Sequence, residues 1–146
     1  MAPNLKEIVA DYIHEGKQYS ESRDMFYLTV KRIGKIAEGG SLDFGGSEYS
    51  EAEVEWIETV KKSPDDSYGW WNLSEGYYWV EYNEKINLPE DSNIFFQPWE
   101  KALKAGLSHP SGIISEPREV LATIIFVGKG GIGIKENARI SELYLF

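Results

Sequence analysis

The side chains that most often carry out catalysis or bind metals are few in this sequence. His14 and His109 are the two histidines, and the chain contains no cysteine. A metal site or a Ser-His triad is possible in principle, but two histidines so far apart in sequence are more often surface or helix-end residues. We therefore predict no metal ligands, and the absence of cysteine excludes disulfides, a thiolate nucleophile and a cysteine-based metal site.

Carboxylates are abundant, with 24 Asp and Glu residues, and two pairs are adjacent in the chain. Asp65-Asp66 and Glu90-Asp91 both lie in polar segments that contain proline. Acids in such loops are usually solvated, and general acid/base work requires a positioned group with a tuned pKa. We interpret both pairs as solvated loop residues.

A short basic segment, PWEKALKAGLSHPSG (98–112), stands out because it favours a helix within a half-chain that otherwise favours strands. Trp99 to Lys104 fits one helical turn, and Lys101 and Lys104 lie three residues apart, on one face. Two ammonium groups near a helix start could hold a phosphate. The alternative is a solvated face on which Glu100 pairs locally with a lysine.

A glycine-rich segment, GKGGIG (Gly128–Gly133), matches the G-x-G-x-x-G pattern of dinucleotide-binding proteins. That function requires a strand before the motif, a helix after it and an acidic residue about 20 positions later. Here only 13 residues follow, and they resemble strands. We therefore interpret the segment as a hairpin turn.

The composition predicts one soluble globular domain, residues 1–146, with a core of ordinary size. The formal net charge of −9 opposes binding to nucleic acid or to an anionic membrane. The N-terminal segment carries charges throughout and no apolar run reaches about 18 residues, so we expect a cytoplasmic protein without a membrane span. Many aromatic residues cluster between Tyr68 and Tyr82, which makes a self-associating surface plausible.

The hydrophobic pattern predicts one N-terminal helix followed mainly by strands. Asn4 can cap a helix over residues 5–14, with Glu7 as the capping-box partner and Gly16 after its end. Period-two alternation predicts a strand around 26–31, and further strands are expected at 75–82, 93–97, 120–127, 131–134 and 139–146. Residues 39–47 predict a tight turn with a brief strand, and 49–66 is ambiguous, with a strand favoured over a helix. Many short strands indicate an antiparallel barrel or sandwich.

From about Leu28 onward the chain resembles the dUTPase/dCTP deaminase superfamily, and its archaeal-type members in particular. The resemblance is carried by segments in the family's order and spacing: SLDFGG (41–46), EGYYWVEYNEKINLPED (75–91), PWEKALKAGL (98–107), SGIISEP (111–117) and IGIKENARISELYLF (132–146). It implies a jelly-roll β-barrel with an N-terminal helix and one short internal helix. It also implies a homotrimer with nucleotide sites between subunits, a deoxynucleoside triphosphate substrate with Mg²⁺, and either diphosphate release or cytosine deamination.

The motifs that carry the family's chemistry are altered. Where members have Pro-Arg-Ser-Ser-Leu-x-Arg-x-Gly, this chain keeps Pro98, Leu103 and Gly106 but replaces the phosphate donors with Trp99, Glu100 and Lys101. The aspartate that activates water in a dUTPase is Ser115 here, and the position of the deaminase's catalytic glutamate falls at Ile125. The glutamine of the family's Arg-Ile-Ala-Gln-Leu motif is Glu142, and a Gly-rich C-terminal tail is absent from the sequence.

These departures indicate a degenerate active site on a retained frame. The first hypothesis is a non-catalytic or weakly nucleotide-binding member that acts as a binding or regulatory module. The second is an active dUTP diphosphatase or dCTP deaminase with a rebuilt site, in which Lys101 and Lys104 hold phosphates, Glu116 or Glu119 serves as the base and Mg²⁺ is the cofactor. The third is a subunit that is inert alone and pairs with an active paralogue.

Overall fold

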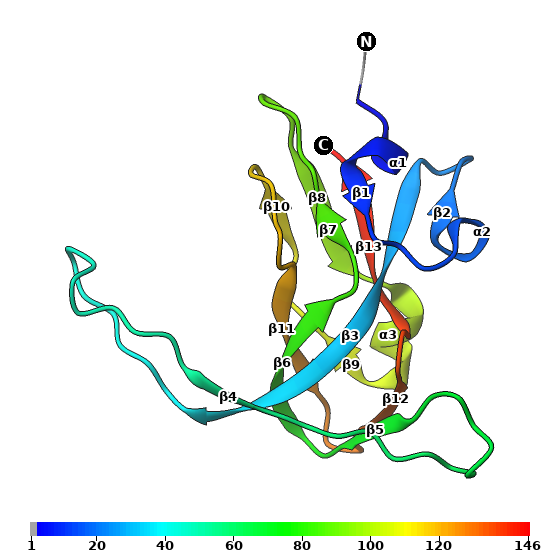
Figure 1. Cartoon of the computed structure of the whole chain (residues 1–146), viewed down its shortest axis with the longest axis vertical. Helices are drawn as coiled ribbons and strands as arrows, with labels where there is room; N and C mark the ends of the chain where they lie inside the picture. The colour runs from blue at the N-terminus through cyan, green and yellow to red at the C-terminus, as the bar shows by residue number, and fades with distance from the viewer. Residues whose placement is uncertain (1–2) are drawn as a thin grey trace.

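The structure is a computed structural model that describes residues 3–146, and it consists mainly of antiparallel strands (Figure 1). Strands hold 46% of the residues and helices 10%. The helices are α1 (Leu5–Ile8), α2 (Glu15–Gln18) and α3 (Glu100–Ala105). The strands are β1 (Val9–Ala10), β2 (Tyr19–Ser20), β3 (Met25–Glu38), β4 (Glu53–Trp56), β5 (Trp70–Leu73), β6 (Gly76–Tyr82), β7 (Lys85–Ile86), β8 (Ile94–Pro98), β9 (Leu107–Ser108), β10 (Gly112–Ile114), β11 (Ala122–Val127), β12 (Ile132–Lys135) and β13 (Arg139–Leu145).

One curled sheet forms the centre of the molecule, with its strands in the order β10-β8-β13-β3-β6-β11-β9. β3 lies in its middle and pairs with β13 over residues 25–29, with β6 over residues 30–34 and with β4 over residues 34–38. Two small sheets, β1-β7 and β12-β5, complete the fold. This architecture confirms the predicted mainly-β class with an N-terminal helix and a short internal helix. The first two residues of the expected 1–146 domain lie outside the described range.

The strands form because apolar and polar residues alternate along them. Inward-facing residues from β3, β6, β11 and β13 meet in one apolar core, which includes Phe26, Leu28, Val30, Ile33, Val80, Ile125 and Leu143. Thr29 breaks the alternation and is buried as well. Its amide and hydroxyl both donate to the carboxylate of Glu84, which also accepts a bond from Gln18. Burial raises the pKa of Glu84 above its ordinary value, and these donors oppose that shift.

The N-terminal helix is shorter than predicted. Asn4 does cap it, since its side chain accepts a hydrogen bond from the amide of Lys6 at 2.8 Å. The helix ends at Ile8, however, because Val9 and Ala10 form a strand that pairs with Ile86 and Lys85. The predicted continuation to residue 14 is therefore wrong: a long-range pairing overrides the local helical pattern. Gly16 ends no helix and instead lies inside α2.

The later strands confirm the period-two prediction, including a strand within the ambiguous 49–66 region, where β4 forms. The GKGGIG segment does turn, with the Gly131 amide donating to the Gly128 carbonyl at 2.9 Å. It is not a hairpin, because β11 pairs with β6 and β9 whereas β12 pairs with β5. The turn therefore carries the chain from one sheet to another. No helix within residues 3–146 is long and apolar enough to cross a membrane.

A two-stranded arm, residues 35–56, extends away from the body of the molecule and is seen at the left of Figure 1. Its base is the pairing of β3 with β4, from Gly34↔Trp56 to Glu38↔Glu53. Asp43 holds the tip in a turn by accepting hydrogen bonds from the amides of Gly46 and Glu48, both at 3.0 Å. The side chains of Leu42 and Phe44 are almost fully exposed there. The turn at the tip is thus held by hydrogen bonds and exposes two apolar side chains.

Candidate functional site

α3 occupies the predicted place in the PWEKALKAG segment, which confirms that prediction. The helix begins after Trp99, whose amide donates to the Ile140 carbonyl of β13 at 2.8 Å. It ends at Gly106, whose φ of 110° is left-handed and favours glycine. Ala102 is buried against the core. The helix is therefore fixed to the sheet, as a site-bearing element must be.

The two lysines of α3 have different partners. Lys104 forms an i,i+4 ion pair with Glu100 at 3.2 Å, and both side chains are about three-quarters exposed. The Lys101 ammonium lies 5.4 Å from the centre of the Trp99 ring. Lys104 therefore pairs locally with Glu100, which is the alternative that the sequence left open. An exposed pair of this kind is worth at most about 1 kcal/mol, so it fixes the position of Lys104 only weakly.

The space beside Trp99 is filled by other side chains. Its ring centre lies 5.0 Å from that of Tyr27, and the guanidinium carbon of Arg139 lies 4.9 Å from the indole centre. Arg139 also lies over Tyr27 and donates to the carbonyl of Lys17. The indole thus forms part of a cation–aromatic stack. Packing of this kind supports a structural role for Trp99.

The carboxylates considered as catalytic bases lie in solvent. Glu116 lies 3.5 Å from Arg118, and Glu119 lies 3.6 Å from Lys85. Their side chains are 78% and 87% exposed, respectively. Ser115, in the position of the family's aspartate, is exposed too. Among the described residues, neither Glu116 nor Glu119 forms an ion pair with a lysine of α3.

A surface pocket of about 380 Å³, here the Arg118 pocket, lies instead next to β10. Residues from β6, β8, β10, β11 and the segment between β10 and β11 line it: Trp79, Phe96, Ile113, Ile114, Arg118, Val120, Leu121 and Ala122. Arg118 is the only charged side chain among these lining residues of the described chain. Apolar walls with a few polar groups are typical of small-molecule sites.

Arg118 stands on a rigid support. Its amide and carbonyl both exchange hydrogen bonds with Ile86 of β7, each at 2.9 Å. Its side chain is bonded only loosely, at 3.5 Å, to Glu116. A guanidinium presents several donors in a planar fork that matches carboxylate and phosphate groups. The arrangement suits a ligand with a flat apolar part and one anionic group.

His109 is buried, which contradicts the prediction of a surface or helix-end residue. Its Nδ1 donates to the Pro110 carbonyl at 2.9 Å, so its Nε2 accepts from the hydroxyl of Ser141 at 2.7 Å. The Tyr82 hydroxyl in turn donates to Ser141 Oγ at 2.6 Å. Burial lowers the pKa of His109 and raises that of Tyr82. His14, the other histidine, caps α2 through its Nδ1 rather than ending the first helix.

The Ser141–His109 pair resembles a catalytic dyad in its hydrogen bonding but lacks access. Ser141 is 0% exposed and His109 6% exposed, with the ring of Phe96 stacked on the imidazole. A nucleophile must reach its substrate. We therefore assign this chain of hydrogen bonds to the stability of β13, and not to catalysis.

Two further positions that the resemblance singles out, Ile125 and Glu142, are both buried. Ile125 is completely buried in the apolar core, so no general base exists at that position. Glu142 is also buried, and it pairs with Arg23 at 3.1 Å.

Arg118 was not singled out from the sequence as a binding residue. Only its place in the SGIISEP-to-VLATIIFV segment could have drawn attention to it, and its apolar neighbours come from distant strands.

The described residues do not fit a protein-held Mg²⁺ site. Mg²⁺ is bound through carboxylate oxygens, usually from one or two side chains together with substrate phosphates. No carboxylate lines the Arg118 pocket, and no group of three His, Asp or Glu residues within 3–146 is placed to hold a metal ion.

Known proteins resemble this chain in sequence and in fold. No family model matches the sequence. It is 26% identical to the "probable deoxyuridine 5'-triphosphate nucleotidohydrolase" of Methanosarcina mazei over 121 residues, covering 82% of this chain and 67% of that protein. It is 28% identical over 123 residues to the protein of the same name from Methanococcoides burtonii, covering 82% and 68%.

A solved structure matches the fold. The 2'-deoxycytidine 5'-triphosphate deaminase of Agrobacterium tumefaciens superposes with a TM-score of 0.58 at 13% identity, covering 95% of this chain and 43% of that one. This chain resembles the dUTPase/dCTP deaminase superfamily. The methanogen relatives agree with the archaeal-type pattern of the motifs. The fold shared with this deaminase therefore extends over nearly the whole chain, while the chain spans less than half the length of the deaminase.

Proposed function

We propose that this chain is a binding module on the dUTPase/dCTP deaminase fold, which holds a deoxynucleotide without cleaving or deaminating it. The base lies in the Arg118 pocket against the rings of Trp79 and Phe96, and Arg118 binds an anionic group. The observation that carries the proposal is the pocket lining: aromatic and aliphatic side chains with one cation and, among the described residues, no carboxylate.

The absence of turnover in this proposal is supported by the positions of the candidate bases. Water attack on a phosphate and deamination both need a group within hydrogen-bond reach of the proton that moves. Glu116 and Glu119 are exposed and paired with cations, and Ile125 is apolar. Loss of general acid/base catalysis alone typically costs 10²–10⁴-fold in rate, on the order of several kcal/mol.

A second function is favoured by the names of the relatives, which are probable deoxyuridine triphosphate hydrolases. In this alternative the chain hydrolyses dUTP with Mg²⁺ carried by the nucleotide. Lys101 and Lys104 then contact phosphates, and Glu116 or Glu119 acts as the base. The ion pairs of Lys104 with Glu100 and of Glu116 with Arg118 would first have to open.

A binding and turnover experiment tests the proposal. The purified chain is titrated with dUTP, dCTP and dUMP in the presence of MgCl₂ by calorimetry, and the same samples are assayed for pyrophosphate and ammonia. We expect binding without product, and a roughly tenfold or greater loss of affinity in Arg118→Gln, because a charge-assisted hydrogen bond is removed. Arg32→Gln is the matched control, since Arg32 pairs with Glu81 outside the pocket.

Product formation would contradict the binding-only function. Turnover that is lost in Glu116→Gln or Lys104→Ala would support the second function instead. Nucleotide binding that is equal in the native chain and in Arg118→Gln would place the ligand elsewhere.

The proposal includes the homotrimer that the resemblance implies. Exposed apolar side chains held on an ordered element are typical of association surfaces. Leu42, Phe44 and Tyr49 are such residues on the arm. A second copy that covers them would convert the arm from an exposed projection into part of the assembly.

A further inference from the structure

β3 and β6 separate at one residue and leave a gap between them. Gly34 pairs with Trp79 of β6 on one side and with Trp56 of β4 on the other. Beyond Gly34, β3 follows β4 into the arm, whereas β6 continues beside β11 as far as Gly76↔Val127. The gap is a pocket of about 230 Å³, here the notch, lined by Lys35, Ile36, Glu75, Gly76, Tyr77 and Tyr78.

The backbone of Tyr77 faces the notch. Amides alternate in direction along a strand, and the Tyr82 amide points toward β11, where it donates to Leu121 at 2.8 Å. Asn83, one residue on, donates in the other direction, to Thr29 of β3. The backbone N–H and C=O groups of odd-numbered β6 residues therefore face β3. The pairing of β6 with β3 ends at Trp79, before Tyr77. Its N–H and C=O form an open strand edge in this part of the described chain.

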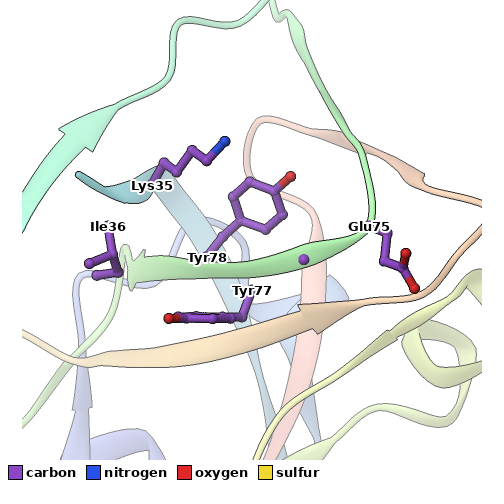
Figure 2. A pocket seen from close by; sticks show the side chains of 6 residues that line it. Lys35, Ile36, Glu75, Tyr77 and Tyr78 are labelled. Carbon is purple, nitrogen blue, oxygen red and sulfur yellow. The ribbon is translucent and has the colours of Figure 1, made fainter. Parts of the chain in front are cut away.

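The side chains around this edge differ in charge and in the face they occupy. Figure 2 shows Tyr78 and the ammonium end of Lys35 on one side of β6, Tyr77 on the opposite side and Glu75 at the beginning of the strand. Tyr78 is buried and its hydroxyl donates to the Ser74 carbonyl at 2.8 Å, so it forms a fixed wall. Tyr77 is half-exposed and contacts the exposed ring of Phe126.

We propose that the notch binds an extended peptide segment of a partner protein, which adds to the open edge of β6 as a short antiparallel strand. Main-chain groups that lack a ladder partner are matched by another extended main chain, as in other strand-addition sites. Antiparallel pairing agrees with both existing neighbours of β6 and is slightly the more stable arrangement.

The charges set the order of the partner's residues. Antiparallel to β6, the segment passes first Tyr78 beside Lys35, then Tyr77, Gly76 and Glu75. It therefore carries, from N to C, an acidic residue, a β-branched residue, a large apolar residue and a basic residue. The large residue lies over Gly76, which offers no side chain, and the end charges complement Lys35 and Glu75.

The probe is the blocked hexapeptide Ser-Glu-Val-Phe-Lys-Ser with a fluorescent label, and its anisotropy is measured with the full chain. Its valine exchanges two hydrogen bonds with Tyr77. The control peptide has the same sequence with an N-methyl group on the valine amide, which removes one of these bonds and leaves every side chain in place. We expect at least a roughly fivefold loss of affinity for the control. Hydrogen exchange of the Tyr77 amide is expected to slow when the unmethylated peptide is bound.

Charge reversal tests the direction of the strand. The peptide Ser-Lys-Val-Phe-Glu-Ser is expected to bind the native chain more weakly than the first probe, and to recover affinity with the double variant Lys35→Glu, Glu75→Lys. Both substituted side chains lie at the surface pocket, and thermal unfolding of the variant verifies that the fold is kept. The Arg118→Gln variant is expected to bind the probe as the native chain does, which separates this site from the proposed nucleotide site.

Three results would overturn the inference. Equal binding of the N-methylated peptide would show that the edge is not used. Absence of binding by the first probe at millimolar concentration would show that the notch does not accept this class of segment. Protection of the Tyr77 amide that increases with protein concentration alone would assign the notch to a second copy of this chain.

Discussion

Ser141 links a tyrosine and a histidine that the chain brings together from three separate strands or loops. Tyr82 donates to it, and it donates to His109, whose other nitrogen is committed to Pro110. With a neutral imidazole, the Nδ1–H is given to the Pro110 carbonyl and Nε2 accepts from Ser141. Burial lowers the pKa of His109, and the hydrogen bond to Pro110 opposes that shift. Burial therefore penalises the charged ring in the folded chain.

His109 is therefore expected to make the protein less stable in mild acid. The unfolded chain takes up a proton at the histidine's ordinary pKa of 6.5, whereas the folded chain does so only at lower pH. In that window the unfolded state binds more protons, so the free energy of unfolding falls as pH drops below about 6.5. Urea unfolding between pH 5 and 8 measures this slope, which His109→Gln is expected to reduce.

The matched control for this prediction is His14→Gln, which removes the other histidine and leaves His109 in place. The acid-side loss is expected to persist in it. A slope that is identical in the native chain and in His109→Gln would contradict the assignment of this loss to His109.

At the scale of an element, Gly34 determines how closely β4 packs on β3. A Cβ built on Gly34 would lie 2.3 Å from Val54 Cγ1 and 3.0 Å from the Trp56 ring, so only glycine allows β4 to pack on β3 here. Gly34→Ala is expected to loosen the base of the arm, at a cost of about 1–3 kcal/mol. Hydrogen exchange in β4 and limited proteolysis of residues 39–52 would detect it.

Gly39→Ala is the control for Gly34→Ala, because a Cβ at Gly39 would contact nothing within 4 Å. It is expected to leave exchange in β4 unchanged. Equal exchange in the two variants would mean that the crowding at Gly34 is relieved without cost.

The tip of the arm is expected to contribute to self-association. Phe44→Ser removes an almost fully exposed aromatic side chain and leaves the Asp43 turn intact. Sedimentation velocity is expected to show a smaller species for the variant at equal concentration, with an unchanged melting temperature. Phe146→Ser, which alters another exposed phenylalanine outside the arm, is expected to sediment as the native chain does. A native chain that sediments as a monomer at all concentrations would rule out this role.

At the scale of the whole molecule, the net charge is distributed unevenly. Seven of the 24 acidic residues lie between Glu38 and Glu58, and that stretch contains no lysine or arginine. The rest of the chain, by difference, carries 17 acidic and 15 basic residues, and is close to neutral. Most of the net charge of −9 therefore lies in residues 38–58, a stretch that includes most of the arm. Long-range electrostatic effects on encounters with other molecules follow the orientation of the arm.

The sequence predicts the fold well where the determining interactions are local. Alternation along β6 and β11, the cap at Asn4 and the glycine that ends α3 are all visible in short windows. It fails where distant segments decide. Val9 and Ala10 extend because Ile86 and Lys85 lie beside them, and His109 is buried because β13 returns to it.

The candidate site follows the same division. The motif residues Trp99, Glu100 and Ser115 are readable in the sequence, and none of them is among the residues that line the Arg118 pocket. The pocket itself combines residues from β6, β8, β10 and β11, so no window of sequence contains it. Lys101 and Lys104 are near each other in the chain, yet their partners differ because Glu100 lies one helical turn from Lys104.

The transfer of β3 from β6 to β4 at a single glycine separates the molecule into two parts that can evolve independently. Insertions, deletions and substitutions beyond Gly34 change the length and chemistry of the arm, while the ladder that encloses the core ends before them. Whatever the arm contacts can thus impose its own selection on residues 35–56. The core is not exposed to that selection, so relatives are expected to diverge first in the arm.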